Sequence, residues 1–289
     1  MCSMDSGRTS LAGASPFLRT HATRHIHAGG FGFHHLHAGS GRPLILVHGG
    51  GMWLYTYRHI ISPLSRSFSV FALDMPGYGY TTLPDDAVPM SLGTMTTALK
   101  GFMTALGLDR ASFVGHSWGG GWVLAFALAF PSMADRLVLM DSSGLDVPDV
   151  MEWELLKIPV LGEILLRVLT QGMVRRRLMK SFHDPFLVDS AMAQEVYLPL
   201  KIPANRKAQA AASRNLSWKS VEAGLPALRN QSMLIWGAQD RYLDVSLASR
   251  FSERLPGLRV EIIPGCGHCP HEEKPSRVVE LVHDFFRTP

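Results

Sequence analysis

A serine between two glycines is the first place in this chain where residue types and spacing point to chemistry. Residues 115–119 read Gly-His-Ser-Trp-Gly, after the apolar run Ala-Ser-Phe-Val and before a long apolar stretch. This context predicts a sharp strand-to-helix turn with strained dihedrals at Ser117, for which the neighbouring glycines leave room. Such a turn points the Ser117 hydroxyl out of the sheet and sets the first amides of a helix beside any oxyanion that forms.

A carboxylate and an imidazole follow in the chain order that this kind of nucleophile requires. Residues 232–240 are an apolar run, a glycine turn and Asp240, and residues 260–268 are an apolar run and a glycine-rich loop that carries His268. Asp240 comes 123 residues after Ser117 (240 − 117), and His268 comes 28 residues after Asp240 (268 − 240). The shorter interval holds one helix, one strand and short loops, so both side chains can reach the same end of a parallel sheet.

Together these segments resemble the α/β-hydrolase superfamily, in its cap-bearing branch with esterases, lactonases, epoxide hydrolases, haloalkane dehalogenases and meta-cleavage C–C hydrolases. The resemblance extends from about residue 30 to the end of the chain, and its matching segments are residues 44–51, 72–80, 115–120, 235–240 and 265–275. It implies an α/β fold with a doubly wound, mostly parallel sheet and an inserted helical cap.

The chemistry of the three side chains suggests a catalytic triad. A serine hydroxyl is too weak an acid to ionise unaided, so a base must take the proton of Ser117 as it attacks. We expect His268 to be that base and later the general acid, because an imidazole has an ordinary pKa of about 6.5. Asp240 is expected to accept the other imidazole N–H and to stabilise the imidazolium.

The tetrahedral oxyanion needs backbone donors. The N–H of Trp118, which follows the nucleophile, is one expected donor, and the resemblance places the other at Gly50 in the glycine loop after His48. Asp141 is a rival to Asp240 as the acid, because some members of the superfamily carry the carboxylate at the end of the preceding strand.

The nucleophile restricts the reaction. Relatives that open epoxides or remove halides use aspartate where this chain has Ser117, so acyl transfer is expected: a carboxylic ester, lactone or thioester of small-to-medium apolar or acyl type is hydrolysed through an acyl-enzyme. The alternatives are a C–C hydrolase of the meta-cleavage type and a non-hydrolytic ligand-binding or cyclase member. The meta-cleavage assignment is weakened because Met52-Trp53-Leu54 replaces the Pro-Gly-Ala that often follows the His-Gly-Gly-Gly loop in those enzymes.

Apolar strands alternate with amphipathic stretches up to Asp141, which predicts the parallel sheet. This alternation of strands and helices stops for the 90 residues from Ser142 to Gln231 (231 − 142 + 1). That is too many residues for an ordinary crossover between two strands. We expect a core of residues 30–144 and 218–289, a helical cap of residues 145–217, and a disordered leader of residues 1–29 without a signal peptide. The expected cap helices are residues 150–156, 162–169, 174–180 and 189–197.

Composition is typical of a globular protein, with 46% hydrophobic and 18% charged residues. The net charge of +4 and the isoelectric point near 9.1 indicate a mildly basic surface. The densest basic run, 175–177, is expected to be a solvated helix face and not a nucleic-acid site. No apolar run reaches membrane-spanning length, and an odd count of three cysteines favours the reducing cytoplasm.

No cofactor or metal is expected. The Cys-x-x-Cys pair at 266 and 269 has no second half-site, and binding His268 to zinc would remove the base from Ser117. The histidines between residues 21 and 37 lack accompanying carboxylates or thiols. His48 and His116 flank the site and are expected to brace loops. The sequence leaves the oligomeric state open.

Overall fold

The described residues form one mixed eight-stranded sheet. The computed structural model describes residues 12–84 and 88–287, and the strand order across the sheet is β1-β2-β4-β3-β5-β6-β7-β8. The pairings β1–β2 and β2–β4 are antiparallel and all others are parallel. The strands are β1 Thr23–Ala28, β2 Phe31–Ala38, β3 Arg42–Val47, β4 Phe68–Leu73, β5 Ala111–His116, β6 Ala134–Met140, β7 Ser232–Gly237 and β8 Arg259–Ile263. This is the predicted doubly wound, mostly parallel α/β sheet.

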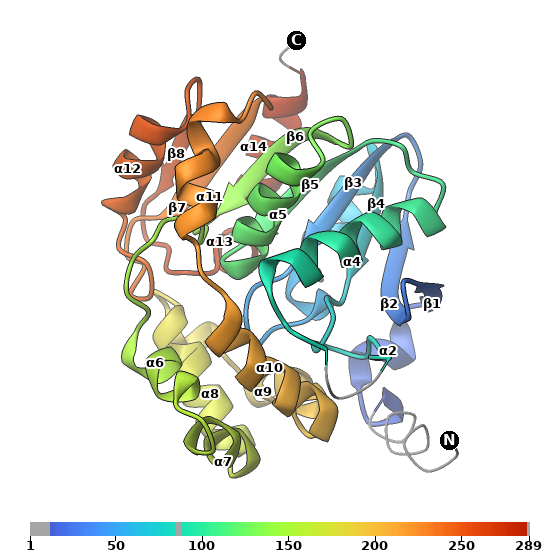
Figure 1. Cartoon of the computed structure of the whole chain (residues 1–289), viewed down its shortest axis with the longest axis vertical. Coiled ribbons are helices and arrows are strands. Elements are labelled where there is room, and N and C mark those ends of the chain that lie inside the picture. The colour runs from blue at the N-terminus through green and yellow to red at the C-terminus, as the bar shows by residue number, and fades with distance from the viewer. Residues whose placement is uncertain (1–11, 85–87, 288–289) are drawn as a thin grey trace.

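Helices cover both faces of the sheet (Figure 1). β3 shows the consequence: Ile45 and Val47 pack into the cluster that contains α4 and α5, whereas Leu44 and Leu46 pack into the cluster that contains α3 and α14. A parallel strand that is buried on both faces is apolar throughout. In the described residues, the helices outside the predicted cap are α2 Pro16–Thr20, α3 Ile61–Leu64, α4 Leu92–Ala105, α5 Trp118–Ala129, α11 Lys219–Gly224, α12 Leu247–Arg254, α13 Pro270–Glu273 and α14 Pro275–Arg287, with short 3₁₀ turns at Leu54–Tyr57 and Leu225–Ala227. A further 3₁₀ turn, Pro185–Leu187, falls within the range of the predicted cap.

In the described part of the chain, six α-helices follow β6 before the chain returns to the sheet at β7, and the first five of them precede α11. These five are α6 Met151–Lys157, α7 Leu161–Arg167, α8 Gln171–Ser181, α9 Ser190–Leu200 and α10 Pro203–Asn215. They lie together beside one end of the sheet, below it in Figure 1, and all of them fall within the range predicted for the cap. The division into a core and a separate cap domain stays a prediction. None of the helices in the described residues is both long and apolar enough to cross a membrane.

The sequence predicts a disordered leader over residues 1–29. This prediction is wrong for the segment from residue 16 to residue 28, which contains α2 and β1. β1 pairs with β2 along its whole length, and the tight turn between them is made by Gly29 and Gly30 with φ of 56° and 84°. A two-residue turn with positive φ at both positions matches the twist of a hairpin, and glycine adopts it without strain. Ser15 caps α2 by accepting from the Leu18 amide. Residues 1–11 lie outside the described residues.

Candidate active site

Ser117 sits at the predicted sharp turn between β5 and α5. Its φ of 52° and ψ of −123° lie where side chains other than glycine are strained. The flanking glycines are required by close backbone approaches. A Cβ on Gly115 would lie 2.6 Å from the Gly120 Cα, and one on Gly119 would lie 2.1 Å from the Val47 carbonyl oxygen. The strained turn predicted from the sequence is thus present.

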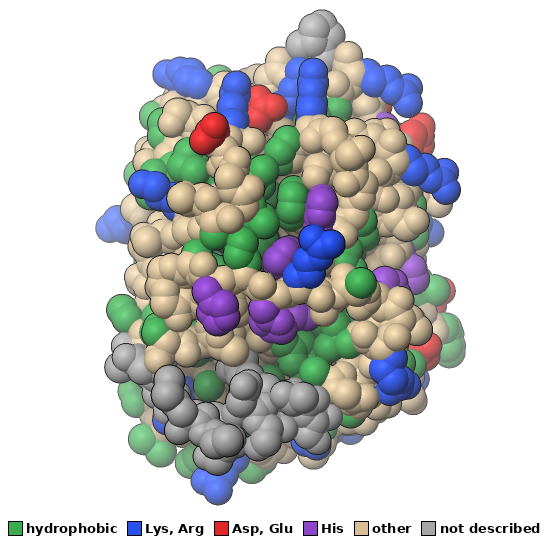
Figure 2. Space-filling view, turned by 90° about the vertical axis from the view of Figure 1, so that its right-hand side faces the viewer, with side chains coloured by type: hydrophobic (Ala, Val, Ile, Leu, Met, Phe, Trp, Pro, Cys, Tyr) green, Lys and Arg blue, Asp and Glu red, His purple; other side chains and the backbone are tan. Residues whose placement is uncertain are grey.

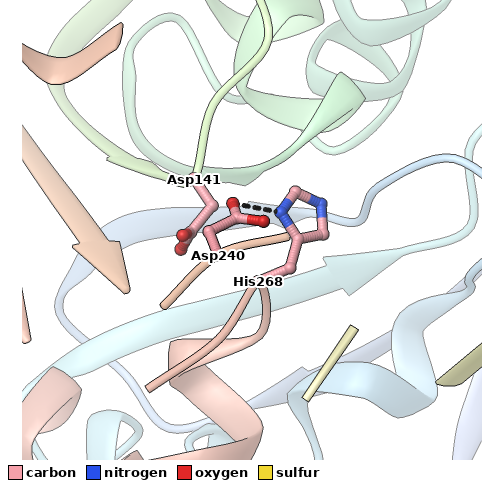
Figure 3. A group of neighbouring side chains, drawn as sticks. All are labelled: Asp141, Asp240 and His268. Carbon is pink, nitrogen blue, oxygen red and sulfur yellow. Dashed lines mark hydrogen bonds and ion pairs between the residues drawn. The ribbon is translucent and has the colours of Figure 1, made fainter. Parts of the chain in front are cut away.

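His268 donates its Nδ1–H to Asp240 Oδ2 over 2.7 Å, as Figure 3 shows. The other carboxylate oxygen of Asp240 accepts the amides of Tyr242 and Leu243 at 2.7 and 3.1 Å. Burial alone would raise the pKa of Asp240, but His268 and the two amides outweigh it, so this pKa lies below its ordinary value. Asp240 is therefore an anion that holds the ring of His268 in one tautomer.

Ser117 and His268 line the same cavity. Among the described residues, no hydrogen bond joins the Ser117 hydroxyl to the imidazole. Such a bond is often long in the absence of substrate and tightens when substrate is bound. The His268 loop is fixed from two sides, because its amide donates to the Ser181 carbonyl at 2.8 Å and its carbonyl accepts from His116 Nε2 at 2.7 Å. The imidazole of His268 is thus held at one place in the wall of the cavity.

His48 and His116 brace loops, as the sequence predicts. His48 Nε2 accepts the Met75 amide at 3.0 Å, and His116 holds the loop of His268. Burial, and then the neighbouring His268, lower the pKa of His116 to about 3. His116 is consequently neutral at physiological pH, and its hydrogen bond shows that the proton is on Nε2.

The two expected oxyanion donors lie beside the nucleophile. Trp118 is the first residue of α5, so its amide has no acceptor within the helix. Gly50 lines the cavity with Ser117 and Trp118, and a Cβ on it would lie 2.9 Å from the Trp118 indole. Only a glycine lets this loop approach so closely.

The predicted cap helices close the cavity from the side opposite the sheet. About 80 Å³ is open to water-sized molecules, which is room for several waters and suits a small substrate. Trp153 on α6 and Arg177 on α8 belong to the lining, and the Arg177 guanidinium carbon lies 4.2 Å from the centre of the Trp153 ring. Among the described residues Arg177 makes no ion pair, so its charge is available inside the cavity.

Sequence reasoning missed Arg177, which it placed with 175 and 176 on a solvated helix face. The cavity-lining residues of α8 are Val174, Arg177, Leu178 and Ser181. They recur at positions i, i+3, i+4 and i+7, the spacing of one helix face. This periodicity was the signal that separates Arg177 from its two exposed neighbours.

Within the described residues, one group of three potential metal ligands comes together: Asp141, Asp240 and His268, with one ligand atom of each within 4.8 Å of the others (Figure 3). The 2.7 Å bond between Asp240 and His268 already joins two of these atoms. The geometry is that of a hydrogen-bonded acid and base. His25 and His27 of β1 are exposed, and Figure 2 shows histidine side chains gathered on the side of the molecule on which β1 lies.

The chain belongs to the alpha/beta hydrolase family, because residues 44–281 match the sequence model of that family. It is 31% identical to a 2-hydroxy-6-oxo-6-(2'-aminophenyl)hexa-2,4-dienoic acid hydrolase of Metapseudomonas resinovorans, over 91% of this chain and 90% of the relative. It is 28% identical to a 2-hydroxy-6-oxo-2,4-heptadienoate hydrolase of Pseudomonas putida, over 91% and 95% of the two chains.

Solved structures show the same likeness. A meta-cleavage product hydrolase from Pseudomonas fluorescens superposes with a TM-score of 0.79 at 26% identity, over 91% of this chain and 97% of that one. The class of protein is therefore defined as an α/β hydrolase. The relatives are hydrolases of dienoic acids, so the comparisons favour the C–C hydrolase alternative over the ester hydrolase that the sequence put first.

Proposed function

We propose that this protein is a serine hydrolase that cleaves a carbon–carbon bond in 2-hydroxy-6-oxo-2,4-dienoic acids, with Ser117 as nucleophile, His268 as base and Asp240 as acid. The observation that carries the proposal is the 2.7 Å bond between His268 and Asp240 at the wall of a cavity that Ser117 also lines. The names of the relatives supply the substrate class.

The residues act in two steps. Ser117 Oγ adds to the ketone carbon while His268 takes its proton, and the amides of Gly50 and Trp118 stabilise the oxyanion. The dienoic acid reacts in its keto form, in which the proton of the 2-hydroxyl group has moved to C5, because a vinyl carbanion at C5 could not be delocalised. When the adduct collapses, the C5–C6 bond breaks, its electron pair passes through the C3=C4 double bond to the 2-oxo oxygen, and that oxygen accepts the proton from His268. Water, deprotonated by His268, then hydrolyses the ester on Ser117 and releases a carboxylic acid.

Arg177 supports an acidic substrate. Its guanidinium lines the cavity without an ion-pair partner among the described residues, and Trp153 stacks against it. A planar guanidinium matches the geometry of a carboxylate. We infer that Arg177 binds the carboxylate of the dienoic acid while the ketone lies at Ser117.

Carboxylic-ester hydrolysis is the second candidate. The observation that favours it is Met52, which lines the cavity just beyond the oxyanion loop, where the meta-cleavage enzymes often have Pro-Gly-Ala. The same three catalytic residues would form the same acyl-enzyme, with an alcohol in place of the carbon leaving group. The two reactions differ only in the bond that is broken at the carbonyl carbon, which is a C–C bond in the dienoate and a C–O bond in the ester.

The proposal also includes a cytoplasmic protein without nucleic-acid partners. Cys266 and Cys269 are buried free thiols in the described part of the chain, as expected in a reducing compartment. With Arg177 in the cavity, only Arg175 and Arg176 of the basic run are fully exposed, which is too little for a nucleic-acid surface.

The purified protein tests the proposal with two substrates side by side. Hydrolysis of 2-hydroxy-6-oxo-6-phenylhexa-2,4-dienoate bleaches its conjugated chromophore, and hydrolysis of p-nitrophenyl acetate releases p-nitrophenol. We expect the dienoate to be the better substrate and Ser117→Ala to lose both activities. Turnover of the ester alone would support the second candidate, and equal rates for the wild type and Ser117→Ala would refute both.

A further inference from the structure

Asp141 is a second carboxyl group placed directly behind the proposed triad. It follows β6 and is completely buried, and its φ of 41° is positive although it is not glycine. Its amide donates to the Ile235 carbonyl at 3.0 Å, and its Oδ1 accepts the Gly237 amide at 2.9 Å. A strained backbone held on both sides indicates that the position of this carboxyl group is fixed by its surroundings.

The carboxyl groups of Asp141 and Asp240 lie close together. A carboxyl oxygen of each lies within 4.8 Å of one of the other, and Figure 3 shows the two carboxyl groups side by side with His268 on the far side of Asp240. A hydrogen bond between two carboxyl groups needs one proton, because two carboxylates offer only acceptors. One of the two residues must therefore be a neutral acid.

The distribution of donors decides which residue holds the proton. Asp240 accepts three N–H donors, from His268, Tyr242 and Leu243, whereas Asp141 accepts one. The Asp141 Oδ2 is buried and no N–H or O–H group of the described residues donates to it. Donors stabilise the ionised form of a carboxyl group, so Asp240 is the anion.

The titratable groups around Asp141 also favour its neutral form. Burial first, and then Asp240, raise the pKa of Asp141 well above its ordinary value, and Glu273 adds to this. Cys266 and Cys269 also lie close enough to interact with Asp141, and both are neutral thiols whose pKa burial raises. Among the described residues no lysine, arginine or histidine pairs with Asp141, because its Oδ1 accepts the Gly237 amide and its Oδ2 accepts no N–H group.

We propose that Asp141 is a neutral carboxylic acid at physiological pH that donates its proton in a hydrogen bond to Asp240, and so positions Asp240 against His268. Asp141 does not line the cavity, so it is a positioning residue and not a catalytic one. Its neutrality matters because a second anion here would make His268 hold its proton to higher pH and leave less free base. The kinetic part of this inference rests on the proposed function, and the protonation does not.

Infrared difference spectroscopy tests the protonation without any substrate. A protonated carboxyl group has a carbonyl-stretching band that a carboxylate lacks. We expect the spectrum of the wild type minus that of Asp141→Asn to contain this band at pH 7. Asp135→Asn, in β6 but near the surface in a pair with Arg110, is the matched control and should remove no such band. A difference spectrum with a carboxylate band in its place would overturn the proposal.

Kinetics with the dienoate test the positioning. In Asp141→Asn the amide oxygen still accepts from Gly237 and the NH₂ group still donates to Asp240, so kcat should stay within about twofold of the wild type. Asp141→Ala lacks the donor, and its kcat should fall by about tenfold with KM unchanged. The acid limb of the kcat/KM profile should be the same for Asp141→Asn and the wild type.

Two results would contradict the positioning role. If Asp141 were the anion that supports His268, Asp141→Asn would lose kcat by about a thousandfold or more. If it were an ionised bystander, its loss would shift the acid limb to lower pH. Should the dienoate and esters not be hydrolysed at all, the proposed function fails, while the infrared band still decides the protonation of Asp141.

Discussion

His116 carries a pH dependence that follows from its burial. Its folded pKa is about 3, and the pKa of an unfolded histidine is about 6.5. Because the folded pKa is the lower one, the unfolded chain binds a proton first, and the free energy of unfolding falls as the pH drops from about 6.5 toward 3. His116→Gln keeps a side-chain donor but does not titrate, so its slope between pH 6 and 4 should be smaller by about 1.4 kcal/mol per pH unit. Urea titrations at several pH values measure this, and parallel slopes would contradict it.

Arg177 should determine the charge preference of the substrate. Arg177→Met removes a charge-assisted hydrogen bond to the carboxylate, which is worth about 2 kcal/mol, so KM for the dienoate should rise roughly thirtyfold. KM for the neutral ester p-nitrophenyl acetate should not change. Arg176→Met, one position away on the exposed face of α8, is the control and should leave both KM values as they are. An equal rise for both substrates in Arg177→Met would mean a loss of packing against Trp153.

The sequence was enough to propose Ser117, Asp240 and His268 as the catalytic residues, which stays a prediction, but it did not single out Arg177. Ser117, Asp240 and His268 each follow an apolar strand, and the ends of neighbouring parallel strands meet at one edge of the sheet. Arg177 lies on a helix whose position over the site depends on the packing of the whole predicted cap. The basic run 175–177 has the same sequence whether its side chains face solvent or a cavity, so the sequence alone does not distinguish the two.

Among the elements, the turn between β5 and α5 is packed closely against the backbone of β3. A methyl group on Gly119 would lie 2.1 Å from the Val47 carbonyl oxygen, and only backbone movement can relieve this. Gly119→Ala should therefore lower the free energy of unfolding by about 3 kcal/mol. Gly172→Ala, in α8 where a Cβ would come no closer than 4.0 Å to Thr170 Oγ1, is the control and should gain about 0.5 kcal/mol from helix propensity. Chemical denaturation of both variants checks this, and similar effects in the two would argue against a close-packed turn.

β1 and α10 escaped prediction for different reasons. β1 stands before the region of resemblance and has the largely polar sequence Thr-Arg-His-Ile-His-Ala, so its place in the sheet comes from the Gly29-Gly30 turn and from its packing against β2 and α4. α10 carries no stripe of large apolar residues. It buries Ala208 and Ala212 together with polar side chains such as Gln209, so a search for leucine and valine at helical intervals passes over it.

At the scale of the whole molecule, hydrogen bonds join the segment around α2 to the predicted cap. Glu195 on α9 is buried and accepts the Ser15 hydroxyl at 2.7 Å and the Phe17 amide at 2.8 Å. Glu195→Ala should leave these donors unpaired and lower the free energy of unfolding by about 2 kcal/mol. It should also speed proteolytic cleavage before β1. Glu280→Ala, at an exposed position of α14, is the control, and equal cleavage rates in the two variants would refute the link.

The central claim is that Ser117, His268 and Asp240 act as one proton-transferring unit. An alkyl fluorophosphonate, which reacts only with an activated serine, tests it by peptide mass spectrometry. We predict one label per chain, on the peptide that contains Ser117, and almost none in His268→Gln at the same exposure. An unlabelled wild type, or label on Ser117 that does not depend on His268, would contradict the account.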